Sequence, residues 1–138
     1  MSDSKIPSSD EILKSYAAMI NEPDPRLYDA LATVHGNHST PITVSVSGVI
    51  YSGMMVSERV WLEENLKLIQ KADFEHKQSH VDYYNDLISE YDANPHRPAI
   101  ALHMKDVKII SHPTADMPIF LWRIRIDRVD AFHVGRMP

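Results

Sequence analysis

The spacing of apolar residues changes its period three times along this 138-residue chain, at Pro41, Ser57 and Pro98. A helix repeats every 3.6 residues and a strand every two, so such switches divide a chain into elements. Apolar residues recur at helical spacing before Pro41 and again across residues 57–94, a stretch without glycine or proline. Between and after these segments they alternate. The order predicts helices, two strands, a helical insertion and three further strands.

Two helices are expected within residues 8–36. Ser8 and Glu11 form the Ser-x-x-Glu pattern of a capping box, which satisfies the free amides at a helix start. Asp24 is placed as the N-cap of the second helix, and Gly36 is expected to end it. The insertion is too long for one helix in so small a domain. We therefore predict two helices there, broken within residues 71–79.

The strand segments carry two signs of strong bending. Residues 42–47 alternate apolar side chains with small hydroxyls, and a Ser-Gly pair at their end predicts a tight turn into the second strand. Gly53 lies inside that second strand, which is typical of a sheet that bends sharply. In the third strand the alternation slips by one residue near Lys105 and Asp106, which predicts a bulge.

Together these patterns predict an α+β fold in one domain spanning residues 1–138. Its centre is a small, strongly bent, antiparallel five-stranded barrel of Sm-like or SH3-like type. The first two strands are expected at 42–56 and the last three at 99–137. The helical insertion at 57–94 follows strand two.

Composition narrows the class of protein. The chain has no cysteine, which excludes a disulfide framework and a thiolate metal site. No apolar run approaches the ~20 residues of a membrane span, and the polar start does not resemble a signal peptide, so we expect a cytoplasmic protein without membrane contact. The net charge is −5, and the acidic insertion precedes a mildly basic end. This distribution argues against nucleic acid as a partner and suits self-association, although a solvated surface also explains it.

The chain offers little that could carry catalysis. His76 and His80 are four residues apart with acidic neighbours, a spacing that can place two imidazoles on one helix face for a metal. The segment is polar and lacks a His-Glu-x-x-His motif, so a solvated helix face is the preferred interpretation. Ser45 and Ser47 lack a nucleophile elbow, and no glycine-rich phosphate loop is present. We predict no enzyme activity, no metal and no cofactor.

Four residues are candidates for binding a protein partner. Trp61 and Tyr83 are aromatic residues of the insertion, and aromatic side chains are enriched at the centres of interfaces. Arg123 and Arg125 flank an apolar strand face and could add charge. The alternatives are core packing within the insertion and two arginines that only face water. The insertion itself is either a working interface or a structural lid over the barrel.

Two blocks, residues 42–64 and 100–137, resemble the gas vesicle accessory protein U family. The resemblance is most specific at the end of the chain, which carries Trp122, Arg123, Ile126, Val129, Asp130, Phe132, Val134 and Gly135 at the family's spacing. It implies a non-enzymatic protein that influences gas vesicle assembly or clustering. Vesicle shell proteins and further copies of the chain, as a homo-oligomer, are then the expected partners.

The same ending is similar to the second motif of Sm-like proteins. Residues 124–129 follow their Ile-Arg-Gly-Asp-Asn-Ile pattern, but Ile126 stands where they have glycine. The Asp-x-x-Asn with which those proteins contact RNA is missing. An Sm-like barrel is therefore expected, and a small RNA-binding module is the alternative function.

Overall fold

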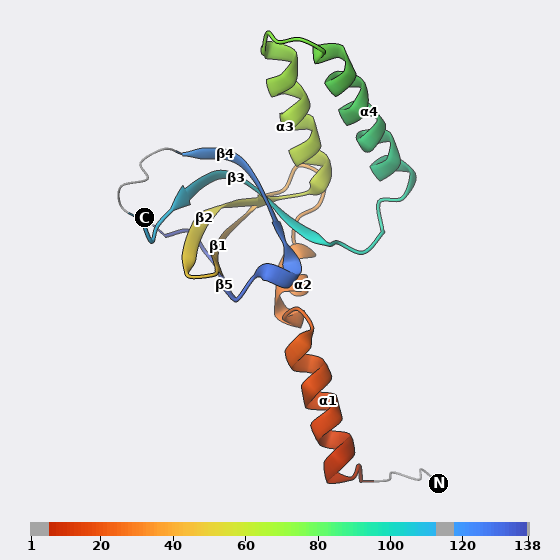
Figure 1. Cartoon of the computed structure of the whole chain (residues 1–138), viewed down its shortest axis with the longest axis vertical. Coiled ribbons are helices and arrows are strands. Elements are labelled where there is room, and N and C mark those ends of the chain that lie inside the picture. The colour runs from red at the N-terminus through yellow and green to blue at the C-terminus, as the bar shows by residue number, and fades with distance from the viewer. Residues whose placement is uncertain (1–5, 113–117, 138) are drawn as a thin grey trace.

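The computed structural model describes residues 6–112 and 118–137. The elements follow the predicted order, with two helices, two strands, a helical hairpin and three strands (Figure 1). Their bounds are α1 Ser9–Asn21, α2 Pro25–Leu31, β1 Thr40–Val46, β2 Val49–Val56, α3 Glu58–Lys71, α4 Lys77–Ala93, β3 Ala101–Ile109, β4 Ile119–Arg125, a 3-10 turn at Ile126–Arg128, and β5 Ala131–Val134.

The five strands form one antiparallel sheet in the order β4-β3-β2-β1-β5. The α+β class is thus confirmed. The sheet is strongly bent, but β4 and β5 are not paired with each other in the described part of the chain, so the sheet is open. The predicted small barrel is therefore not confirmed. Both β4 and β5 are edge strands.

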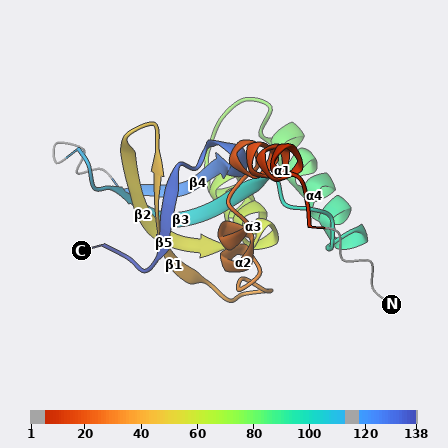
Figure 2. The ribbon, with the colours of Figure 1, turned by 90° about the horizontal axis from the view of Figure 1, so that it is seen from below.

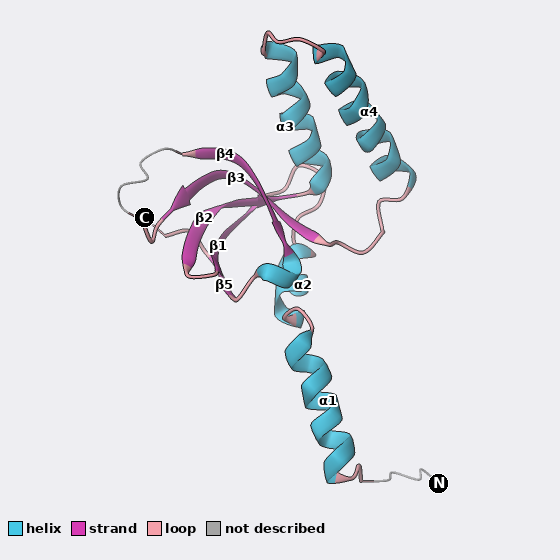
Figure 3. Ribbon diagram, viewed as in Figure 1, coloured by secondary structure: helices cyan, strands magenta, loops and turns pink. Residues whose placement is uncertain are grey.

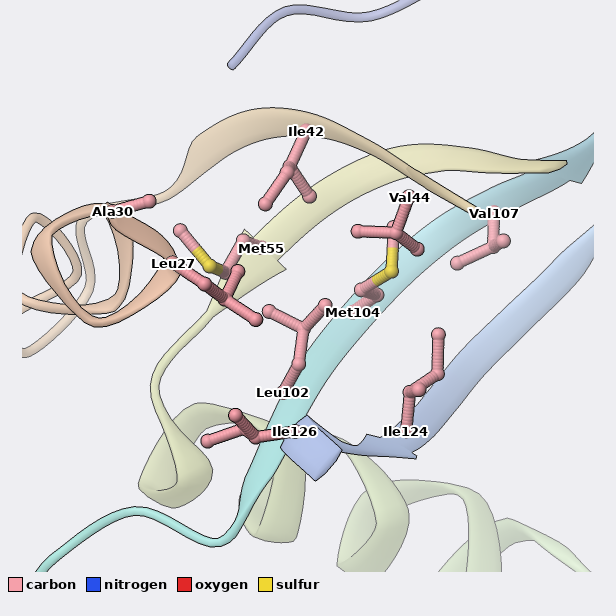
Figure 4. Close-up of a cluster of buried hydrophobic side chains, with 10 residues drawn as sticks. All are labelled: Leu27, Ala30, Ile42, Val44, Met55, Leu102, Met104, Val107, Ile124 and Ile126. Carbon is pink, nitrogen blue, oxygen red and sulfur yellow. The ribbon is translucent and has the colours of Figure 1, made fainter. Parts of the chain in front are cut away.

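The hydrophobic core lies between one face of the sheet and α2. Alternation along the strands directs one set of side chains to this face, as the period of two requires. Leu27 and Ala30 of α2 complete the cluster (Figure 4). The strand members and the residue that follows β4 are Ile42, Val44, Met55, Leu102, Met104, Val107, Ile124 and Ile126.

The predicted bend and bulge are confirmed and belong to one feature. The register of β2 against β3 shifts between Ser52 and Met54. Opposite this shift, Asp106 has a positive φ of 53°. A Cβ on Gly53 would lie 2.9 Å from the carbonyl oxygen of Lys105, so only glycine lets the two backbones approach this closely.

The helix starts were predicted correctly. The Ser8 hydroxyl accepts a hydrogen bond from the Glu11 amide at 3.2 Å, and the Glu11 carboxylate accepts one from the Ser8 amide at the same distance. The Asp24 carboxylate caps α2 by accepting from the Arg26 amide. The end of α2 was predicted wrongly, because it stops at Leu31 and not at Gly36. At the end of α2 the Thr33 hydroxyl donates a hydrogen bond to the carbonyl oxygen of Ala30, so a side chain caps the last turn of the helix.

Helix α1 extends away from the sheet and is viewed nearly end-on from below (Figures 1 and 2). Its apolar residues Ile12, Leu13 and Tyr16 are exposed. None of the helices in the described ranges has the length and apolar character needed to cross a membrane.

Candidate interaction surface between the helical hairpin and the sheet

Helices α3 and α4 form a hairpin, residues 58–93, that stands on the sheet and points away from it (Figure 3). The predicted break within residues 71–79 is confirmed, since α3 ends at Lys71 and α4 begins at Lys77. Ser57 starts the hairpin. Its hydroxyl accepts from the Val60 amide at 3.2 Å and donates to the Gly36 carbonyl at 3.1 Å.

Ion pairs hold the base of the hairpin together. The Arg59 guanidinium donates to both carboxylate oxygens of Asp92, at 2.8 and 3.1 Å, and also to Glu63. The hydrogen bond with Asp92 raises the pKa of Arg59, and in return Arg59 lowers the pKa of the Asp92 carboxyl. Arg97, just after α4, donates to Glu58 at 3.1 Å. These contacts connect the start of α3 with the end of α4 and the segment that follows it.

The hairpin is seated on the sheet face opposite the core. His103 lies between the core residues Leu102 and Met104, so the alternation of β3 turns its ring to the other face. There the ring packs against the indole of Trp61, with ring centroids 5.1 Å apart. Leu62, next to Trp61 on α3, is also buried. Trp61 and His103 are therefore the central contact between the hairpin and the sheet.

The Trp61 and His103 rings interact by packing and not through hydrogen bonds, although both rings contain nitrogen. The Trp61 Nε1 and His103 Nε2 atoms are buried and have no hydrogen-bond partner among the described residues. The pKa of His103 is lowered to about 3, mainly by burial, and the charges of Arg123 and Arg97 contribute in the same direction. His103 is thus neutral at physiological pH and packs as a flat ring.

The two candidate arginines lie beside this seat, on edge strand β4. Arg123 pairs in register with His103, and Arg125 pairs with Ala101. Together with Ile100 and Ala101 they line an open cavity of about 450 Å³. Arg125 donates to Asp127 at 2.8 Å, whereas Arg123 has no carboxylate within 4 Å in the described ranges. The surface presents cationic groups around an exposed aliphatic side chain.

The four predicted partner residues fall into different environments. Trp61 is half-buried in the seat, and its ring partner His103 pairs in register with the exposed Arg123 of β4, the strand that also carries the exposed Arg125. Tyr83 lies on α4, is 57% exposed and packs edge-on against Tyr84 at 5.6 Å. Burial raises the pKa of Tyr84 and the neighbouring Tyr83 adds to this, while the charge of Arg123 acts in the opposite sense.

The sequence alone did not single out His103, the strand residue against which the hairpin packs. The signal was its position between two core residues, which sends it to the face that the insertion covers. Exposed apolar residues at the far end of the hairpin, Leu68 and Phe74, were also missed.

The helical metal-site hypothesis for His76 and His80 does not match the backbone. His76 precedes α4 with a left-handed φ of 59°, so the two residues do not share a helix face. The His80 ring packs against Phe74 at 5.4 Å. Among the residues that the structure describes, no three His, Cys, Asp or Glu side chains are grouped for a metal.

Comparison with known proteins places this arrangement in a family. Residues 27–137, which include α2, the hairpin and the whole sheet but not α1, match the family model described as gas vesicle protein GvpU-like. Searches of curated proteins and of solved structures gave no match. The matched segment contains both the hairpin seat and the edge strands. The chain therefore belongs to the GvpU-like family of gas vesicle proteins.

Proposed function

We propose that this protein is a non-enzymatic, cytoplasmic accessory factor of gas vesicles that acts by binding other proteins. The family match over residues 27–137 is the observation that carries this proposal. The fold supports this proposal, because the hairpin projects like an arm from a sheet that has its own hydrophobic core (Figure 1). Such an arm suits contact with a large assembly better than it suits enclosing a small substrate.

The far half of the hairpin is the surface that we assign to the vesicle. Three large apolar side chains are exposed there, namely Leu68 at 46%, Phe74 at 41% and Tyr83 at 57%. Covering exposed aromatic and leucine side chains removes apolar surface from water, and aromatic side chains are enriched at the centres of protein interfaces. The proposed partner is a protein of the gas vesicle shell.

Self-association is the second part of the proposal. Within residues 6–112 and 118–137, the open sheet leaves two strand edges unpaired, and unpaired edges favour contact with other chains. A protein that both binds vesicles and associates with itself would draw vesicles into clusters.

The vesicle contact can be tested by shortening the hairpin. Replacing residues 67–83 with a short Gly/Ser linker removes the exposed apolar residues but keeps Trp61, Tyr84 and the Arg59–Asp92 pair. We expect this variant to remain folded, by circular dichroism and thermal unfolding, and to lose co-sedimentation with purified gas vesicles.

A pair of matched variants separates the surface from the fold. Leu68→Ser with Tyr83→Ser should weaken co-sedimentation. Leu13→Ser with Tyr16→Ser removes comparable exposed apolar area from α1, which lies outside the family match, and should not. Full co-sedimentation of a folded shortened protein would show that the far half of the hairpin is not the vesicle contact.

A further inference from the structure

The outer side of α4 carries a row of carboxylates. Asp82, Asp86 and Glu90 follow one another at intervals of four residues, and all three are exposed. At 100° per residue they occupy a narrow stripe along the helix. Gln78 donates to Asp82 at 2.9 Å, while Asp86 and Glu90 have no cation within 4 Å among the described residues. We call Asp86 and Glu90 the acidic stripe.

The acidic stripe faces away from its own molecule. The half-buried residues of α4 that pack inward include Val81, Tyr84, Ile88 and Tyr91. Their mean direction on a helical wheel lies about 160° from that of the stripe. The arginines of β4 are on the inward side, since Arg123 pairs in register with His103, whose ring packs against the hairpin. The stripe therefore cannot reach the arginines of the same chain.

The exposed arginines of β4 offer a matching surface. Arg123 and Arg125 are two residues apart on one face of a strand, so their Cα atoms are about 6.7 Å apart. Asp86 and Glu90 are one helical turn apart, a rise of about 6 Å. The two spacings agree closely enough for two parallel charge pairs. Arg123 has no carboxylate partner in the described ranges, and Arg125 can exchange its exposed partner Asp127.

We propose that the acidic stripe of one copy docks on Arg123 and Arg125 of a second copy. The proposal rests on the self-association in the proposed function and names the two surfaces that meet. Because the two patches lie on opposite sides of α4, the contact is heterologous. A pair of copies keeps one free patch of each kind, the arginines on one copy and the acidic stripe on the other. Assembly then proceeds head to tail into open chains. The exposed Ile100, beside the arginines, supplies an apolar contact at the rim.

Two charge-reversal variants test this contact. The first, Arg123→Glu with Arg125→Glu, removes the basic patch and keeps the acidic stripe. The second, Asp86→Lys with Glu90→Lys, does the reverse. Both variants retain a net negative charge, so opposite net charges cannot explain an association between them. Lys14→Glu with Lys71→Glu is the matched control, because it changes the net charge as the first variant does at exposed positions elsewhere. Thermal unfolding confirms that each variant is folded.

Light scattering coupled to size exclusion gives the result. At ~100 µM protein and ~50 mM salt, we expect the wild type and the control to have a measured mass of about twice the monomer mass or more. At ~1 M salt, where charges are screened beyond about 3 Å, they should return to the monomer. Each reversal variant alone should be monomeric. An equimolar mixture should assemble again into alternating chains, because the acidic stripe of the first variant meets the arginines of the second, and the reversed stripe of the second meets the reversed patch of the first.

The proposal would be overturned by a monomeric wild type at low salt, by a reversal variant that assembles like the wild type, or by a mixture that stays monomeric. A monomeric control would equally overturn it, because net charge and not the two patches would then govern assembly. If the protein is monomeric but still co-sediments with vesicles, the proposed contact between copies is refuted and the proposed vesicle binding is not.

Discussion

Replacing the buried His103 should change how the stability of the protein depends on pH. His103 is 6% exposed, packs on Trp61 and has its pKa lowered to about 3. An unfolded chain returns the imidazole to a pKa of about 6.5. Between these two values the unfolded state binds more protons than the folded state. Stability should therefore fall as the pH drops from 6.5 towards 3.

The size of the effect follows from the difference between the two pKa values. Each pH unit in this window costs about 1.4 kcal/mol, so lowering the pH from 6.5 to 5 should remove about 2 kcal/mol of unfolding free energy. This is a large part of the ~5–15 kcal/mol that holds an ordinary domain folded. The cause is burial first, and the charges of Arg123 and Arg97 add to it.

Urea unfolding of the wild type and of His103→Phe between pH 5 and 8 measures this contribution. Phenylalanine keeps a ring against Trp61 and removes both the titration and the unpartnered Nε2. The wild type should lose about 2 kcal/mol more than the variant across that range. His38→Phe, at an exposed position, controls for the loss of a histidine and should follow the wild type. If the unfolding free energy of the wild type and of His103→Phe changes with pH in parallel, the lowered pKa of the buried His103 is refuted.

Three further outcomes are expected. Gly53→Ala should lower the unfolding free energy by about 1–3 kcal/mol, because its Cβ meets the Lys105 carbonyl, and unchanged stability in urea would contradict this. Gly36→Ala should also cost about 1–2 kcal/mol, because Gly36 has a left-handed φ of 54°, although a Cβ there meets nothing within 4 Å. Arg59→Gln should cost no more than about 1 kcal/mol, since its ion pairs with Asp92 and Glu63 are partly exposed, and a larger loss would show that they anchor the hairpin. Fluorescence anisotropy with single-stranded RNA at ~150 mM salt should show no nanomolar binding, and such binding would favour the RNA-module alternative.

The order of elements was predictable from the sequence because local patterns encode it. Gly53 and the phase slip at Asp106 are separate local signals, and they meet in one bulge because β2 and β3 are neighbours in the sheet. The capping pairs at Ser8 and Asp24 are equally local. The end of α2 was missed because Thr33 caps the helix with a side chain before the chain reaches Gly36.

Closure of the sheet and the hairpin seat depend on contacts between distant residues, which the pattern along one strand does not contain. Alternation shows that β4 and β5 are strands, but it does not state whether their edges meet. The role of His103 depends on which element covers the second face of the sheet. Only the fold shows that α3 does so, through Trp61.

The two proposed contacts lie on different parts of the hairpin, so they can be lost separately. The vesicle contact uses exposed apolar side chains of the far half, and burying such surface is insensitive to moderate salt. The contact between copies uses Asp86 and Glu90, nearer the base, and salt screens it. The variant without residues 67–83 retains this stripe and both arginines. It should therefore still increase in mass at low salt while it no longer co-sediments with vesicles. Loss of both properties in a folded protein would mean that one surface serves both contacts.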